Sequence, residues 1–501
     1  MTAAEEIAEW AAGLRFADLP AEVVNAARAH LVDAVGCAVA GIRRGAASPA
    51  LAVAEGLGGP PEARLFTGAR LGAVAAAFGN AVAVHALDFD DTHPGGLVHA
   101  SAVTVPVALA VGEQVSAERA GIGRGGNGRG DAGRGGGAAS GGVAGQSPGE
   151  EMLTALVAGL ETVCRLGAAA PHGFHTRGLH ATSICGPVAA AVTAGRLYGL
   201  DAPTMTAAIG IAASGAAGLL EFLHSPASTK QLHPGTAVAN GILAARLAAA
   251  GATGPAGALD GKFGLYQALA ARAPDREVLL GGLGRRWETT RIAIKHYPCC
   301  QLSHASLDAA RALAPAPAPP SVGGPIQPPT TDIFERLSTG PGPAPPVVGG
   351  AIQPPPTDIF ARLSTRRVGV TLHPGAMPII GGPEKRRPRS AYEAKFSVYF
   401  CVAAMLIDGR VDLDTFDHLD RPDLLDLAAR IEVDTKDSAE VPADAPGIVT
   451  VNGRLSIVDS AAGPGVREKA AANLGPKAAG VFAAVDAGPD NLLDAIEGCL
   501  A

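Results

Sequence analysis

Carboxylates and histidines crowd into one short stretch of the chain, HALDFDDTHPGGLVHAS at residues 85–101. Asp88, Asp90, Asp91 and His93 fall within six positions, and His99 follows six residues later. Apolar, alanine-rich segments flank the stretch. Histidine titrates near neutral pH, and a neighbouring carboxylate can fix its tautomer. This pattern indicates acid–base chemistry at the edge of a buried region.

Three further segments concentrate ionisable side chains, and each is followed by a helix of small residues. They contribute His175 and His180 in GFHTRGLHATSICGP, Lys230 and His233 in LHSPASTKQLHPGTA, and Lys295, His296 and His304 in KHYPCCQLSH. Lysines can bind the carboxylates of a small anionic substrate. Together the four segments favour removal of a proton next to a carboxylate, followed by loss of water or CO2.

Two other kinds of site fit the same residues less well. Mixed aspartate and histidine ligands could bind a metal, but the chain has no HExxH motif, no EF-hand spacing and no cysteine trio for an iron–sulfur cluster. A nucleophilic cysteine needs an exposed, electropositive setting, and Cys299 and Cys300 in YPCCQL are more typical of buried packing. A single histidine such as His93 is as compatible with a structural role as with a catalytic one. We therefore expect no metal.

Composition bounds the class of protein. The 501 residues are too many for one ordinary core, so two or more domains are expected. Apolar residues make up 48% and aromatic residues 4%, which favours closely packed, alanine-rich helices. A net charge of -7 argues against a nucleic-acid partner. Seven cysteines without a CxxC motif, and an acidic N-terminus unlike a signal peptide, predict a cytoplasmic protein without a membrane span.

The pattern along the chain predicts a mostly α fold with a second, α+β domain. Residues 1–267 are expected to form helices, with a disordered glycine- and arginine-rich insertion at 116–150. Short β-like runs such as TTRIAIKHY and RRVGVTLHP mark an α+β domain over 268–462. Within it, a proline-rich tandem duplication covers 313–365. Residues 463–501 are again helical.

The ordered set of motifs resembles the MmgE/PrpD family. The segments that carry the resemblance are ALDFDDTH, GLHATSICGPVAAA, STKQLHPGTAVANG, KHYPCCQLSHASLDAA and YEAKFSVYFCVAAMLIDG. The resemblance implies a large helical domain built from both chain ends, a smaller α+β lid domain and a homodimer. It also implies an active site between the domains that uses neither a metal nor an organic cofactor.

The resemblance assigns family site positions to Asp88, Thr92, His99, His180 and Lys230. His99 would transfer the proton, Asp88 would orient it or bind substrate, and Thr92 would contact substrate oxygens. Lys230 and His180 would hold a carboxylate and stabilise the charge that develops in the intermediate. The remaining substrate-binding candidates are His233 and Lys295.

The implied activity is that of a cofactor-independent lyase that dehydrates a small di- or tricarboxylate resembling 2-methylcitrate. The alternatives within the family are decarboxylation of cis-aconitate and epimerisation of iminodisuccinate. Cys300 falls where the decarboxylase branch uses a histidine, so dehydration is the first expectation. A non-catalytic interaction scaffold, built around the insertion and the duplication, is the alternative of another class.

Overall fold

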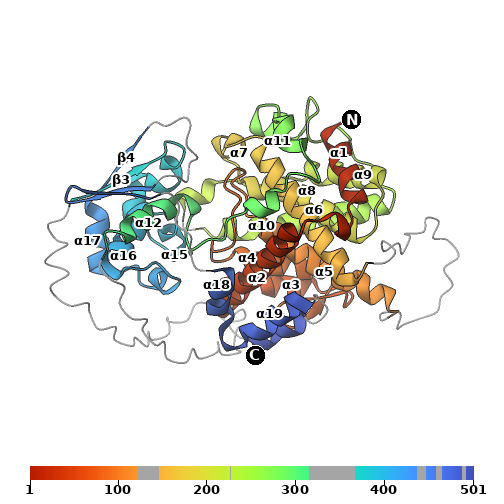
Figure 1. Cartoon of the computed structure of the whole chain (residues 1–501), viewed down its shortest axis with the longest axis horizontal. Helices are drawn as coiled ribbons and strands as arrows, with labels where there is room; N and C mark the ends of the chain where they lie inside the picture. The colour runs from red at the N-terminus through yellow and green to blue at the C-terminus, as the bar shows by residue number, and fades with distance from the viewer. Residues whose placement is uncertain are drawn as a thin grey trace, which may run out of the picture.

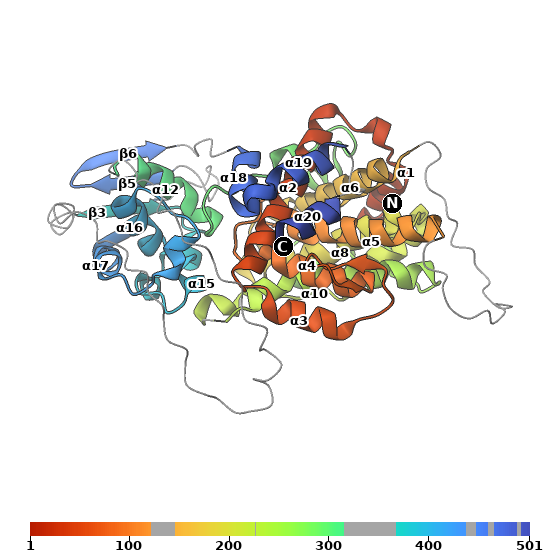
Figure 2. The same cartoon turned by 90° about the horizontal axis from the view of Figure 1, so that it is seen from below.

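The computed structural model describes residues 1–121, 146–225, 227–314, 367–436, 447–458, 465–487 and 492–500. The chain forms two bodies that lie side by side, a larger helical domain and a smaller domain that carries the main sheet (Figure 1, Figure 2). The expected fold class is therefore confirmed.

The helical domain draws its helices from both ends of the chain. The N-terminal part comprises α1 (Ala3–Gly13), α2 (Ala21–Arg43), α3 (Ser48–Leu57), α4 (Ala73–His85), α5 (Val105–Arg119), α6 (Pro148–Ala168), α7 (Gly173–Thr176), α8 (Ala181–Leu197), α9 (Ala202–Ser214), α10 (Thr229–Ala249) and α11 (Arg276–Leu280). The C-terminal part adds α18 (Val466–Leu474), α19 (Ala478–Ala487) and α20 (Leu492–Leu500). A small two-stranded sheet pairs β1 (Ala63–Arg64) with β2 (Arg70–Leu71). Figure 2 shows α18 lying beside α2.

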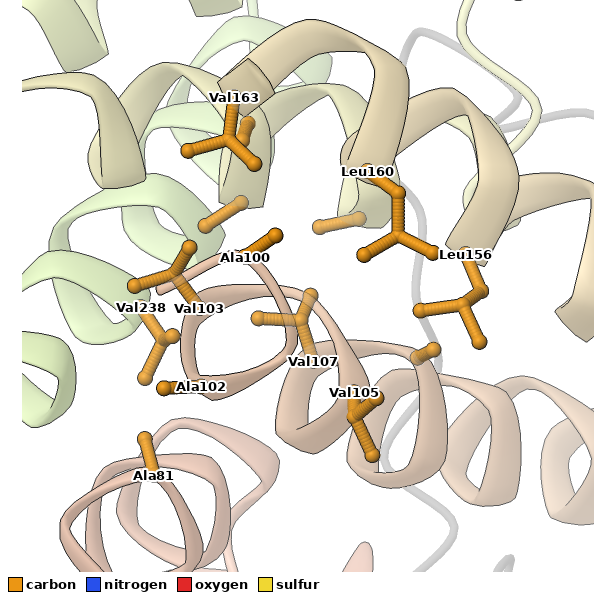
Figure 3. Packing of buried hydrophobic residues seen from close by; sticks show 14 of the residues in the cluster. Ala81, Ala100, Ala102, Val103, Val105, Val107, Leu156, Leu160, Val163 and Val238 are labelled. Carbon is orange, nitrogen blue, oxygen red and sulfur yellow. The ribbon is translucent and has the colours of Figure 1, made fainter. Parts of the chain in front are cut away.

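Small residues let these helices approach closely. A Cβ added at Gly241 of α10 would lie 2.4 Å from the Cβ of Ala190 on α8, and one added at Gly41 of α2 would lie 2.6 Å from the carbonyl oxygen of Ala83 on α4. Alanine and valine fill the space between neighbouring helices in Figure 3. The low aromatic content thus reflects a core packed by backbone proximity rather than by large rings.

Helices α5 and α6 take up both ends of the insertion predicted at 116–150. Ser116–Arg119 form the last turn of α5, and α6 begins at Pro148 with a capping box between Ser147 and Glu150. The rest of the predicted insertion lies outside the described residues. The predicted duplication at 313–365 also lies outside them, apart from its first two residues.

The second domain is built on a four-stranded sheet of order β4-β3-β5-β6. The strands are β3 (Val368–Leu372), β4 (Ile431–Thr435), β5 (Gly447–Val451) and β6 (Arg454–Val458), with β3 parallel to β4 and antiparallel to β5. Alternate residues of β3 are buried, as expected for a sheet with one covered face. Its helices are α12 (His304–Arg311), α15 (Ala391–Ala394), α16 (Val398–Asp408) and α17 (Pro422–Arg430).

The run TTRIAIKHY is not a strand, contrary to the expectation. Residues Glu288–Arg291 form a 3-10 turn, and Ala293 makes only an isolated bridge to Thr92. The reason is a buried carboxylate on α6: Glu161 accepts hydrogen bonds from the backbone N–H of Thr289 at 2.7 Å and from its hydroxyl at 2.8 Å. The first core extends to Ile292 and the second starts at Tyr297, so the packing changes there rather than at residue 268.

One helix among the described residues, Ala21–Arg43, is long and apolar enough to cross a membrane by length and composition. Its most apolar window is 72% buried inside the protein. The same helix carries buried His30, which pairs with Asp91. A helix that is mostly buried and makes a buried polar contact has the properties of a core helix.

Candidate active site

The loop that follows α4 carries the polar stretch with which the sequence analysis began. Asp88 has a φ of +53°, in the left-handed region that aspartate tolerates better than most residues. The loop then pairs with the extended segment near Ala293 and passes through His99 to the start of α5. Every residue from 87 to 93 is buried, so the loop needs partners for its backbone groups.

Lysines supply several of those partners. Each of three consecutive carbonyl oxygens accepts a hydrogen bond from a buried ammonium of a different part of the chain: Leu87 from Lys395 at 2.8 Å, Asp88 from Lys295 at 2.9 Å, and Phe89 from Lys469 at 2.6 Å. Lys395 belongs to the second domain and Lys469 to the C-terminal helix α18. The loop is therefore fixed jointly by both domains and by the chain end.

The Asp88 carboxylate is shared by two ammonium groups. Its Oδ1 accepts from Lys230 at 2.7 Å and from Lys295 at 2.9 Å, and the side chain is fully buried. Burial on its own would raise the pKa of Asp88, but the two cations hold that pKa well below its usual range. Burial likewise opposes the charge of Lys295, yet Asp88 raises its pKa. Asp90 is a further carboxylate close enough to raise the pKa of Lys295.

His99 has the geometry of a general base. Its Nδ1 lies 3.0 Å from the backbone oxygen of Asp91 and 3.4 Å from Oδ2 of Asp90. Because both oxygens can only accept, Nδ1 carries the proton and Nε2 carries the free lone pair. Burial, reinforced by the nearby lysines, lowers the pKa of His99 to about 4 despite the Asp90 carboxylate. At neutral pH the ring is therefore uncharged and able to accept a proton.

Of the two roles expected for Asp88, orienting this histidine or binding substrate, the geometry assigns the first to other residues. Oδ1 of Asp88 is 3.9 Å from Nε2 of His99, beyond hydrogen-bond distance. The orienting atoms are those of the next two carboxylate residues, since the Asp91 carbonyl and the Asp90 side chain both face Nδ1. Asp90 is held in turn by Nδ1 of His85 at 2.7 Å.

His180 and His233 form a hydrogen-bonded pair of imidazole rings. Their Nδ1 atoms are 3.0 Å apart, so one ring donates there and the other accepts. Burial lowers the pKa of His180 well below its usual range and that of His233 to about 4. Both rings are neutral at pH 7, and the ring that accepts at Nδ1 must carry its proton on Nε2. The pair thus offers a neutral N–H donor.

The predicted side chains meet at one cavity of about 70 Å³. Its lining includes Asp88, Thr92, His99, His180, Lys230 and Lys295. His233 stands behind His180. The second domain closes the cavity with Cys300, Ile379 and Phe396. The ring of Phe396 lies 5.2 Å from Nζ of Lys230 and meets Phe222 edge to face at 6.3 Å.

Two histidines that the sequence left open are now placed. His93 accepts from the N–H of Gly96 at 3.0 Å and lies 3.1 Å from Glu288, so its contacts are structural. His175 lines the cavity together with His180. Sequence reasoning missed Phe222, Phe396 and Lys395, because apolar walls and lysines directed at carbonyls leave no spacing signal.

Within the described chain, two groups of side chains place ligand atoms within 4.8 Å of one another: His85, His99 and His180, and Asp88, Asp90 and His99. The second group fits a cation poorly, because two ammonium groups already engage Asp88 and His85 engages Asp90. In the first group, Nδ1 of His85 is taken by Asp90 and only its Nε2 is free.

A neutral imidazole base beside two buried ammonium groups, closed off by a second domain, is a set of groups suited to acid–base chemistry. The pattern described as the MmgE/PrpD N-terminal domain matches residues 5–277, and that of the MmgE/PrpD C-terminal domain matches residues 364–478. The chain belongs to the MmgE/PrpD family.

Among the similar proteins are cis-aconitate decarboxylases and a protein named for its likeness to them. A cis-aconitate decarboxylase of Aspergillus terreus is 25% identical over 438 residues, which cover 85% of this chain and 77% of that protein. The cis-aconitate decarboxylase of Homo sapiens is 25% identical over 381 residues, or 73% of this chain and 62% of that protein. A cis-aconitate decarboxylase-like protein of Aspergillus oryzae is 27% identical over 316 residues, 61% of this chain and 60% of that protein.

Proposed function

We propose that this protein is a lyase that acts on a small di- or tricarboxylate by acid–base catalysis without a cofactor. The observation that carries the proposal is the state of His99. Its Nδ1–H is held by the Asp91 carbonyl, and its lone pair is on Nε2 beside the Lys230–Asp88–Lys295 cluster. A substrate carboxylate near the lysines would bring its neighbouring C–H bond within reach of that base.

Dehydration, the first expected reaction, uses these groups in two steps. His99 Nε2 takes the proton from the carbon next to the carboxylate, and the electron pair moves into an enolate stabilised by Lys230 and Lys295. The enolate then forms the carbon–carbon double bond as the hydroxyl leaves as water, protonated by the Nε2–H of the His180–His233 pair. Transfer of the proton held by His99 to that pair returns all three rings to their neutral state. Fixed cations aimed at developing charge are worth a few kcal/mol each in such a step.

Decarboxylation is the second candidate, and the names of the relatives favour it. Here the bond between carbon and one carboxylate breaks, CO2 leaves, and the electron pair enters an enolate of a remaining carboxylate. A proton must then reach carbon, and the His180–His233 pair is the donor that the site offers. Cys300 in the cavity wall has its pKa raised to about 11 by burial, so its thiol stays protonated at neutral pH and is an alternative proton donor.

One set of incubations separates these reactions. Purified protein would be given 2-methylcitrate, cis-aconitate or iminodisuccinate while alkene absorbance, CO2 release and proton NMR are followed. New alkene without CO2 indicates dehydration, and CO2 from cis-aconitate indicates decarboxylation. Exchange of the α-proton with solvent, without net loss of mass, indicates epimerisation. Absence of turnover with every polycarboxylate would support a non-catalytic scaffold and end the proposal.

A further inference from the structure

A second, larger cavity adjoins the first. It has a volume of about 390 Å³ and lies between residues 222–224 of the helical domain and residues 384–396 of the second domain. The two cavities share Phe222, Leu223 and Phe396 in their walls. We call the 70 Å³ space the inner cavity and the 390 Å³ space the outer cavity. The edge-to-face pair of Phe222 and Phe396 stands between them.

The inner cavity is much the smaller of the two. Pockets for small organic ligands span about 300–1,000 Å³, and the inner cavity, at about 70 Å³, falls below that range. One carboxylate group of a ligand fits beside Lys230 and Lys295, which line it. The outer cavity adds volume of ligand size directly beyond the phenyl pair.

One cationic side chain that lines the outer cavity is unpaired among the described residues. Arg389 is paired with Glu393, and Lys385 donates to the carbonyl of Leu223 at 3.3 Å. Arg387 also lines the cavity, is exposed and has no hydrogen-bond or ion-pair partner within the described ranges. A guanidinium with all its donors available binds a carboxylate with two parallel hydrogen bonds.

A tyrosine hydroxyl adds a polar group between the outer cavity and the inner cluster, since burial and then Asp88, Asp90 and Cys300 raise its pKa. Tyr392 lines the outer cavity, and its ring lies 5.6 Å from that of Phe396. Its hydroxyl oxygen is buried and unpaired among the residues that the structure describes. A buried hydroxyl without a partner is costly, so a ligand oxygen is a favourable neighbour for it.

We propose that the outer cavity binds a second carboxylate of the substrate through Arg387, while the first lies at Lys230 and Lys295. The inference rests on the proposed function, because it takes the substrate to be a polycarboxylate. It deepens that function by naming the residue that makes the protein prefer di- and tricarboxylates over monocarboxylates. Phe222 and Phe396 would have to part to let the chain between the two carboxylates pass.

Binding without turnover tests this proposal by itself. Titration calorimetry would compare tricarballylate, an unreactive tricarboxylate, with butyrate, which has a chain of similar length and one carboxylate. Arg387→Ala should weaken tricarballylate binding about tenfold, equivalent to about 1.4 kcal/mol, and change butyrate binding by less than about twofold. Tyr392→Phe, which keeps the ring, should weaken tricarballylate by about threefold.

Two further variants guard the interpretation. Arg285 is exposed and lies outside both cavities, so Arg285→Ala should leave both affinities unchanged. Arg387→Lys keeps the charge without the planar fork, and its affinity should fall between those of the parent and Arg387→Ala. Equal losses for both probes, no loss at all, or no tricarballylate binding by the parent chain would each overturn the proposal. If the protein binds tricarballylate and butyrate as expected but turns over no substrate, the proposed carboxylate site is supported and the proposed lyase activity is not.

Discussion

The two walls of the inner cavity differ in what they hold and how firmly they hold it. The helical wall contains a dense, buried polar cluster in which Asp88, His99 and Lys230 contact one another or share partners. The wall from the second domain presents an aromatic ring, two aliphatic side chains, a thiol and the amide of Gln301. The charged side chains of that domain line the outer cavity. The difference indicates that one domain carries the chemistry and the other determines access and selectivity.

A buried lysine of the second domain connects these walls by hydrogen bonds. Lys395 of the second domain donates to the carbonyl of Leu87 at 2.8 Å and to that of Pro298 at 2.7 Å. It is buried, and burial lowers its pKa to about 8 even though Asp88 opposes the shift. Through this lysine, a shift of the second domain would move the loop that holds Asp88.

Removing the base on the helical wall should have the largest effect. His99→Gln deletes the Nε2 lone pair in a side chain of similar length, and kcat is expected to fall about 10²–10⁴-fold. Steady-state kinetics would measure it with the substrate found in the incubations. His418→Gln, at an exposed histidine of the second domain, is the control. A His99→Gln enzyme that keeps more than a tenth of the parent kcat would rule out His99 as the base.

Breaking the lysine–aspartate cluster should affect stability as well as activity. Lys295→Met leaves the buried Asp88 carboxylate with one ammonium instead of two, and the free energy of unfolding should fall by about 3–5 kcal/mol. Chemical denaturation would measure the loss. Asp88→Asn instead leaves the buried ammonium groups of Lys230 and Lys295 without their carboxylate, so it should cost at least as much stability and should also abolish activity. Full activity in either variant would show that the cluster serves folding alone.

Removing the lysine that connects the two walls should have a smaller effect. Lys395→Met removes two hydrogen bonds to carbonyls, and the free energy of unfolding should fall by about 1–3 kcal/mol. We also expect kcat to fall more than KM rises, because Asp88 loses its fixed position while the carboxylate-binding lysines remain. Lys395→Arg should restore part of both. If the Met variant changes KM alone, the second domain does not act through the Asp88 loop.

The pH dependence should show how strongly burial controls the helical wall. The folded chain keeps His99 and His233 neutral down to about pH 4, whereas the unfolded chain protonates them near 6.5. Between pH 6.5 and 4 the unfolded state binds more protons, so the free energy of unfolding should fall as pH is lowered. The acidic limb of kcat/KM should lie near pH 4. A limb at 6.5, unchanged in His233→Asn, would contradict a desolvated base.

Removal of metal should have the smallest effect of all. Asp88 is engaged by ammonium groups and Asp90 by His85, so catalysis is expected to proceed without a cation. Dialysis against a chelator should leave kcat unchanged, and metal analysis should find substoichiometric iron and zinc. Loss of activity that returns with one added divalent metal would instead assign a catalytic ion to His85, His99 and His180.

Much of the fold was predictable because the signal was local. Alanine-rich segments with apolar residues three and four apart gave the helices at both chain ends, and alternating residues in RRVGVTLHP gave β3. TTRIAIKHY failed because a distant carboxylate, Glu161, captured its backbone and hydroxyl donors. No local pattern contains that contact.

For the site, the sequence alone determined which residue types gather around the cavity, since Asp88, His99, His180 and Lys230 stand in recognisable motifs. Only the tertiary structure decided what each one does. It directed Asp88 toward two lysines and assigned the orientation of His99 to the Asp91 carbonyl and the Asp90 side chain. The physical reason is that burial and neighbouring charge set proton positions and pKa values, and both depend on which distant segments meet. A motif specifies the side chain, whereas packing specifies its protonation and its partner.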